Sequence, residues 1–168
     1  MNSKFFRWTL AGVLALSLTG CPPKKQVKTE EPKIEDQAKP AEEPSLRGKE
    51  YKEVADINTV YFDLDQSTLR SDARDILSKN YQVIKDHADW EILVEGHCDE
   101  RGTTEYNLGL GQKRAAAVRQ YYMSLGMSGG KVATISYGKE NPACAEHTED
   151  CWSKNRRAAT KIRAAESK

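Results

Sequence analysis

The stretch VEGHCDERGTTEYN, residues 94–107, decides the fold, because it joins a predicted strand to a predicted helix. Upstream of it, apolar side chains recur at every second position from Trp90 to Val94, which is typical of a strand that stops at Gly96. Downstream, a helical pattern runs from Thr104 to Leu125 and ends at Gly126. The sequence therefore predicts a strand, a short loop and a long helix in direct succession.

The predicted long helix carries a cation on its apolar face. Apolar side chains recur on that face at helical spacing, at Leu110, Val118, Tyr121 and Leu125. Arg114 lies on the same face, and Asn107, seven positions earlier, projects within about 20° of it. Because a guanidinium stays protonated in proteins, a buried Arg114 needs an anion. One interpretation is an internal ion pair with Asp99, which follows the strand; the other is an acidic ligand.

The remaining elements extend from residue 50 to the C-terminus. Their patterns predict strands at residues 56–62, 132–137 and 158–163 and a helix at residues 71–87. The resulting order is β-α-β-α-β-β. It favours an α+β fold, a sandwich in which the helices pack on one face of a mixed sheet.

Several of these segments resemble one known family. Residues 94–107, followed by Leu110 and Arg114, are similar to the signature of OmpA-like peptidoglycan-binding domains. VYFDLD at 60–65, YGKENP at 137–142 and NRRA at 155–158 resemble other segments of that family, in the same order. The resemblance implies an OmpA-like fold and a binding protein that is not an enzyme and needs no cofactor.

The resemblance also implies a ligand, the meso-diaminopimelate of peptidoglycan stem peptides. The side chain of this amino acid ends in an ammonium and a carboxylate. Asp99 matches the family's ammonium-binding aspartate and Arg114 its carboxylate-binding arginine, whose planar fork suits a carboxylate. Asn107 would orient the loop or the ligand. The other predicted wall residues of the pocket are Phe62, Asp63, Arg101, Thr103 and Leu110.

The N-terminal segment has the features of a secretory signal. Lys4 and Arg7 precede an apolar run from Trp8 to Leu18, which is too short for a bilayer span of about 20 residues. The tetrad LTGC at 18–21 resembles a bacterial lipobox. It implies removal of residues 1–20 and acylation of Cys21, including palmitate-type chains, which would anchor the protein stably in the outer membrane with its domain in the periplasm.

A tether is expected between this anchor and the domain. Five of the six prolines lie between Pro22 and Lys49, where aromatic residues are absent. Such a segment buries too little apolar surface to offset the entropy of an ordered chain. The predicted organisation is a signal peptide at 1–20, a lipidated cysteine and flexible linker at 21–49, and one domain at 50–168.

The other three cysteines suggest a disulfide and one free thiol. Cys144 and Cys151 lie seven positions apart in one predicted loop, in a compartment that permits disulfides. A zinc site that uses both cysteines and His147 is the alternative, but it lacks a convincing fourth ligand, and no metal is predicted. Cys98 remains as a small, buried side chain.

Composition and charge exclude one class of function. Lys and Arg number 26 and Asp and Glu 25, which gives a formal net charge of +1. A nearly neutral protein lacks the positive surface that nucleic-acid binding requires, so no nucleic-acid partner is predicted.

Two further function classes compete with wall binding. A glycan hydrolase would use a carboxylate pair drawn from Glu95, Asp99 and Glu100, but a cation next to Asp99 would keep it ionised. A protein-interaction module is the other alternative. The family resemblance implies the Tol proteins TolB and TolA as partners, with a role in envelope integrity and cell division. The basic cluster of Lys154, Arg156, Arg157 and Lys161 is either a solvated face or a docking patch.

Overall fold

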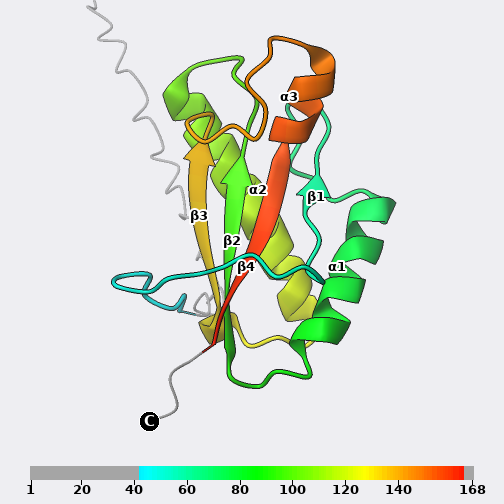
Figure 1. Cartoon of the computed structure of the whole chain (residues 1–168), viewed down its shortest axis with the longest axis vertical. Coiled ribbons are helices and arrows are strands. Elements are labelled where there is room, and N and C mark those ends of the chain that lie inside the picture. Colours follow the sequence, from blue (N-terminus) through cyan, green and yellow to red (C-terminus); the bar gives the residue numbers. More distant parts are fainter. Residues whose placement is uncertain (1–41, 165–168) are drawn as a thin grey trace, which may run out of the picture. The chain divides into compact units, whose positions relative to one another are not determined.

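The computed structural model describes residues 42–164, which form a four-stranded mixed sheet with helices packed on it (Figure 1). The elements are, in chain order, β1 (Val60–Tyr61), α1 (Ser71–Ile84), β2 (Trp90–His97), α2 (Thr104–Ser124), the 3₁₀ helix η1 (Gly129–Lys131), β3 (Val132–Gly138), α3 (Glu149–Asn155) and β4 (Arg157–Ala164). The predicted fold class is confirmed. The predicted signal peptide, Cys21 and the linker up to residue 41 lie outside the described residues.

The strand order is β1-β4-β2-β3, so β2 is central. It pairs in parallel with β3, and α2 is the crossover that such a connection requires. It pairs antiparallel with β4, with Ile92 opposite Ile162 and Gly96 opposite Ala158. The C-terminal strand is thereby inserted between β1 and β2, and the sheet becomes mixed.

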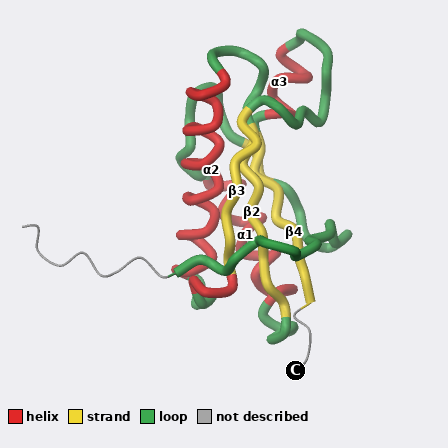
Figure 2. The backbone as a smooth tube through the Cα atoms, turned by 90° about the vertical axis from the view of Figure 1, so that its left-hand side faces the viewer, coloured by secondary structure: helices red, strands yellow, loops and turns green. Residues whose placement is uncertain are grey.

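The hydrophobic core lies between the sheet and the two long helices. Figure 2 shows α2 running along one side of the strands. Ile92 and Val94 of β2 point into the core, where Val118 and Tyr122 of α2 pack against them. Helix α1 adds Ala73, Leu77 and Ile84. The buried face of α2 differs slightly from the predicted one, because Tyr122 rather than Tyr121 is fully buried.

Small residues allow α2 to lie very close to β2. Gly96 of β2 and Gly111 of α2 face each other so closely that a methyl group on Gly96 would overlap the carbonyl oxygen of Gly111. A methyl group on Gly111 would lie 3.0 Å from the Gly96 oxygen. The helix therefore rests directly on the end of β2, which brings Arg114 to the carbonyl of His97.

Three local features differ from the sequence-based expectation. The first strand contains only Val60–Tyr61, because β4 is its single partner. Helix α1 ends at Ile84 rather than at residue 87. The seven-residue helix α3 was not predicted, since a helix this short leaves no clear periodic pattern.

Residues 42–49, assigned to the linker by sequence, contact the domain. The Glu43 carboxylate accepts a hydrogen bond from Thr134 N at 2.9 Å, and Lys49 Nζ lies 2.7 Å from a Glu91 carboxylate oxygen. The chain then crosses the sheet on the side away from α2 (Figure 1). The boundary at residue 50 stays a prediction.

Within residues 42–164, no helix is both long and apolar enough to span a membrane.

The contact between β2 and α2 gives a prediction about two glycines. Gly109 of α2 has open space around its Cα, so Gly109→Ala should raise the free energy of unfolding by roughly 0.5–1 kcal/mol. Gly96→Ala should lower it by about 1–3 kcal/mol, because the helix must move. Urea denaturation measures both. Equal effects of the two substitutions would contradict the close packing described above.

Candidate functional site

A cavity of about 250 Å³ opens where β2 ends and α2 begins. Five predicted site residues line it, namely Asp99, Arg101, Asn107, Leu110 and Arg114. Its other lining residues are Leu64, Asp65, Cys98, Gly102, Tyr106 and Arg156. Residues that are far apart in the sequence therefore converge on one concave surface, which is the usual setting of a small-ligand site.

Arg114 is fully buried, with 0% of its surface exposed. Its three nitrogens donate to backbone carbonyls: Nε to Gln66 at 2.8 Å, Nη1 to His97 at 2.8 Å and Nη2 to Asp63 at 3.2 Å. Burial lowers the pKa of its guanidinium, although an arginine remains charged at physiological pH. Within residues 42–164, no carboxylate forms an ion pair with it. The interpretation of an Asp99–Arg114 ion pair is therefore wrong.

Asp99 has two other cationic partners. Its Oδ2 lies 2.6 Å from Arg101 Nη2 and 3.2 Å from Arg156 Nη1, and its Oδ1 accepts from the Arg101 backbone nitrogen. Burial alone would raise the pKa of this carboxyl, but the hydrogen bonds from Arg101 and Arg156 outweigh burial and lower the pKa. Asp99 is only 4% exposed. It is thus a buried, ionised carboxylate whose negative charge is balanced by the two arginines.

Glu149 completes this network. Its carboxylate lies 2.6 Å from Arg156 Nη2 and 3.7 Å from Arg101 Nη1. The two arginines therefore meet two carboxylates, Asp99 and Glu149. The sequence suggested one cation next to Asp99, namely Arg114. The structure places two other arginines there, Arg101 and Arg156, and no spacing in the sequence identified them as partners of Asp99.

Three predicted wall residues support the cavity instead of lining it. Phe62 is 2% exposed, and its ring centroid lies 5.2 Å from Arg114 Cζ. Asp63 gives its carbonyl to Arg114, while its carboxylate pairs with Arg70 at 2.8 Å. Thr103 caps α2 by accepting from Tyr106 N at 3.2 Å. Asn107, although it lines the cavity, donates to the carbonyls of Arg101 and Thr103, so it orders the loop.

Leu64, Asp65, Tyr106 and Arg156 line the cavity and were missed by the sequence analysis. Asp65 has a φ of 58°, and its exposed carboxylate accepts a hydrogen bond from the Tyr106 hydroxyl. This turn brings Leu64 and Asp65, two positions after Phe62 and Asp63, to the cavity. The left-handed conformation of an aspartate could not be read from the alternation of the preceding strand.

Cys98 also lines the cavity and is buried beside Arg114. Its thiol donates to the Asn107 carbonyl at 3.4 Å, and burial raises the pKa of the thiol. Cys98 is consequently a protonated, packed side chain, as expected from the sequence.

Glu95 lies within β2, whereas Asp99 follows the end of that strand. Its carboxylate is 3.1 Å from Lys161 Nζ and 3.6 Å from His97 Nε2, and it does not line the cavity. The carboxylate pair that a glycan hydrolase would need from Glu95 and Asp99 is therefore not formed.

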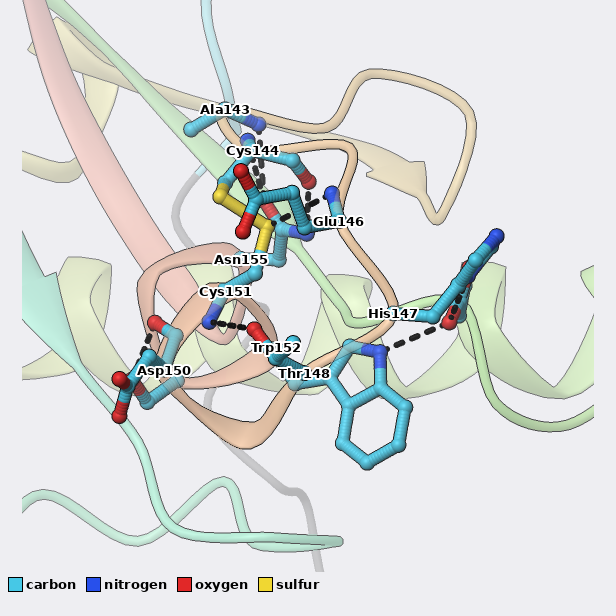
Figure 3. The surroundings of a disulfide bond; sticks show 11 residues. Ala143, Cys144, Glu146, His147, Thr148, Asp150, Cys151, Trp152 and Asn155 are labelled. Carbon is cyan, nitrogen blue, oxygen red and sulfur yellow. Dashed lines mark hydrogen bonds and ion pairs between the residues drawn. A yellow bond between two sulfur atoms is a disulfide. The ribbon is translucent and has the colours of Figure 1, made fainter.

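A disulfide closes the loop between β3 and α3, and Figure 3 shows its surroundings. Cys144 and Cys151 are bonded to each other, so their thiols are not available to the alternative zinc site. The Asn155 side chain binds the backbone of this loop, accepting from Ala143 N at 2.8 Å and Cys144 N at 3.0 Å. No group of acidic, histidine or cysteine side chains in residues 42–164 is arranged to hold a metal ion.

Helix α3, which begins inside this loop, connects the disulfide to the cavity. It carries Glu149, the partner of both arginines. Its Trp152 ring lies 4.2 Å from Arg101 Cζ and donates from Nε1 to Glu100 at 2.8 Å. The loop thus holds the cationic partners of Asp99 in place.

Comparison with known proteins identifies the family of this chain. The OmpA family matches residues 61–156. The chain belongs to the OmpA family. As a member of this family it is a structural protein and not an enzyme, as the sequence predicts.

Among similar proteins, the peptidoglycan-associated lipoprotein of Brucella melitensis is 48% identical over 106 residues, 63% of this chain and 63% of that protein. That of Agrobacterium fabrum is 38% identical over 156 residues, which cover 93% of this chain and 87% of the relative. The crystal structure of the peptidoglycan-associated lipoprotein from Burkholderia pseudomallei has a TM-score of 0.61 and 42% identity, covering 62% of this chain and 89% of that one. The match to the Brucella relative thus spans less than two thirds of either protein.

The disulfide gives a prediction about stability. Reduction should lower the free energy of unfolding by roughly 2–3 kcal/mol, because the bond closes a loop between residues seven positions apart. Urea denaturation with and without a reductant measures the change. The double variant Cys144→Ser/Cys151→Ser is the control and should be insensitive to the reductant. Equal stability of the oxidised and reduced wild type would contradict a structural role for the bond.

Proposed function

We propose that the cavity binds the zwitterionic end of meso-diaminopimelate in peptidoglycan stem peptides. The observation that carries the proposal is the charge of Arg114, which is fully buried and bonded to neutral carbonyls, yet lines an open cavity. A buried cation without an anionic partner is costly. A ligand carboxylate would supply the missing charge.

The carboxylate would bind at the Nη2 end of Arg114. A guanidinium has five N–H donors, and in Arg114 Nη2 gives one hydrogen bond, to the Asp63 carbonyl. Its second N–H is left for a ligand. A hydrogen bond between two charged groups is stronger than one to a neutral carbonyl, so a carboxylate is favoured over an amide here.

The ammonium of the same ligand would meet Asp65 and Asp99. Both carboxylates line the cavity. Asp99 already has two arginine partners, whereas Asp65 is exposed and accepts from the neutral Tyr106 hydroxyl. We therefore assign Asp65 a direct share in ammonium binding, beside the role that the family resemblance implies for Asp99.

For the whole chain, we propose a lipoprotein that tethers the outer membrane to the cell wall without a covalent bond to it. The names of similar proteins and the lipobox-like tetrad ending at Cys21 support this proposal. Residues 1–20 would direct export, Cys21 would carry the lipid and the following segment would span the gap to the wall. In this proposal the protein acts in the Tol–Pal system with TolB and TolA and supports envelope integrity and cell division.

The ligand proposal predicts a preference between two natural types of stem peptide. The protein should bind a soluble stem peptide that contains meso-diaminopimelate at least about tenfold more tightly than the same peptide with lysine, since lysine lacks the carboxylate for Arg114. Isothermal titration calorimetry with the purified protein measures both affinities. Equal affinities would refute the proposed role of Arg114.

The variants for this test must leave the core intact. Arg114→Ala would remove the donors of three carbonyls and destabilise the domain, so its loss of binding would be ambiguous. Asp65→Asn keeps the shape and removes an exposed charge. It should weaken binding of the diaminopimelate peptide severalfold, whereas Asp75→Asn, on the exposed side of α1, should not. Equal affinities of the two variants would refute the role of Asp65.

A further inference from the structure

A second cavity, of about 330 Å³, adjoins the first one. Its lining residues are Tyr61, Phe62, Asp63, Arg70, Ser153, Lys154 and Arg156. Arg156 lines both cavities. The two cavities therefore share one side chain, which places the second cavity next to a ligand held in the first.

Arg156 is a rigid part of both cavities. It is 7% exposed, and its Nε donates to the Phe62 carbonyl at 3.2 Å. Its Nη1 and Nη2 bind Asp99 at 3.2 Å and Glu149 at 2.6 Å. All three nitrogens are thus occupied, so this cation is already neutralised by groups of the domain.

The other two cations of the second cavity, Arg70 and Lys154, differ in whether they have an anionic partner. Arg70 pairs with Asp63 at 2.8 Å and with Asp72 at 2.7 Å. Lys154 is exposed on α3 and forms no hydrogen bond or ion pair with any residue in the described range. Tyr61 lies in the same cavity and is 42% exposed. The cavity therefore presents one unpaired ammonium beside an accessible tyrosine.

We infer that the second cavity binds a second carboxylate of the stem peptide through Lys154, with Tyr61 against the peptide backbone. This inference rests on the proposed function, because diaminopimelate in the first cavity determines which parts of the peptide reach the second. Two carboxylates of the stem peptide lie on the residues next to diaminopimelate, and one residue spans at most about 3.6 Å. They are the α-carboxylate of the glutamate before diaminopimelate and the terminal carboxylate of the alanine after it.

The experiment uses the full-length protein and three synthetic stem peptides that contain diaminopimelate. One peptide has both carboxylates free, one is amidated at glutamate and one is amidated at its C-terminus. The wild type should bind one of the amidated peptides about three- to fivefold more weakly than the free one, as expected for a single partly exposed ion pair. The amidated peptide that loses affinity identifies the carboxylate.

Variants assign this effect to Lys154. In Lys154→Gln the amidated peptides should bind as tightly as the free one, whereas Lys79→Gln, on the exposed side of α1, should retain the wild-type difference. The inference is overturned if amidation has no effect on the wild type or if Lys154→Gln retains the full effect. If the wild type does not distinguish diaminopimelate from lysine, the proposed function fails and this inference with it. If it distinguishes them but ignores amidation, only the present inference fails.

Discussion

The buried guanidinium of Arg114 is the constraint on which the rest of the site depends. It donates to carbonyls of Asp63, Gln66 and His97, which come from the loop after β1 and from the end of β2. Only a helix that lies very close to β2 can bring an arginine to this place, and Gly96 and Gly111 allow that approach. The same side chain thus holds the loops of the cavity together and leaves a positive charge at its floor.

The cavity contains two kinds of charge that differ in how they are compensated. Asp99 belongs to a network with Arg101, Arg156 and Glu149 in which positive and negative groups are matched. Arg114 is bonded to three backbone carbonyls and, at 3.5 Å, to the Cys98 sulfur, and within residues 42–164 it forms no ion pair with a carboxylate. This asymmetry favours a ligand that brings a carboxylate to Arg114. The disulfide-closed loop contributes indirectly, because it supports Glu149 and places Trp152 against Arg101.

The sequence predicts the helices and strands of this structure better than it predicts the contacts of individual side chains. The order of the four strands and two long helices and the inward position of Arg114 follow from local periodicity, and the structure confirms both; the short helices η1 and α3 were not predicted. Leu64 and Asp65 could not be found in this way, because a turn with positive φ at Asp65 interrupts the alternation of the strand. Arg156 reaches Asp99 from 57 positions away, a contact that depends on the position of β4 in the sheet and on the short helix α3. The sequence therefore did not indicate Arg156 as a partner of Asp99, and one of its two interpretations paired Asp99 with Arg114 instead.

The central claim is that Arg114 binds a ligand carboxylate inside this cavity. A crystal structure of the protein with a diaminopimelate-containing stem peptide tests it most directly. The account predicts that the side-chain carboxylate of diaminopimelate lies within hydrogen-bond distance of Arg114 Nη2 and that the ammonium lies between Asp65 and Asp99. A peptide bound elsewhere on the domain, or bound here with its carboxylate turned away from Arg114, would contradict the account.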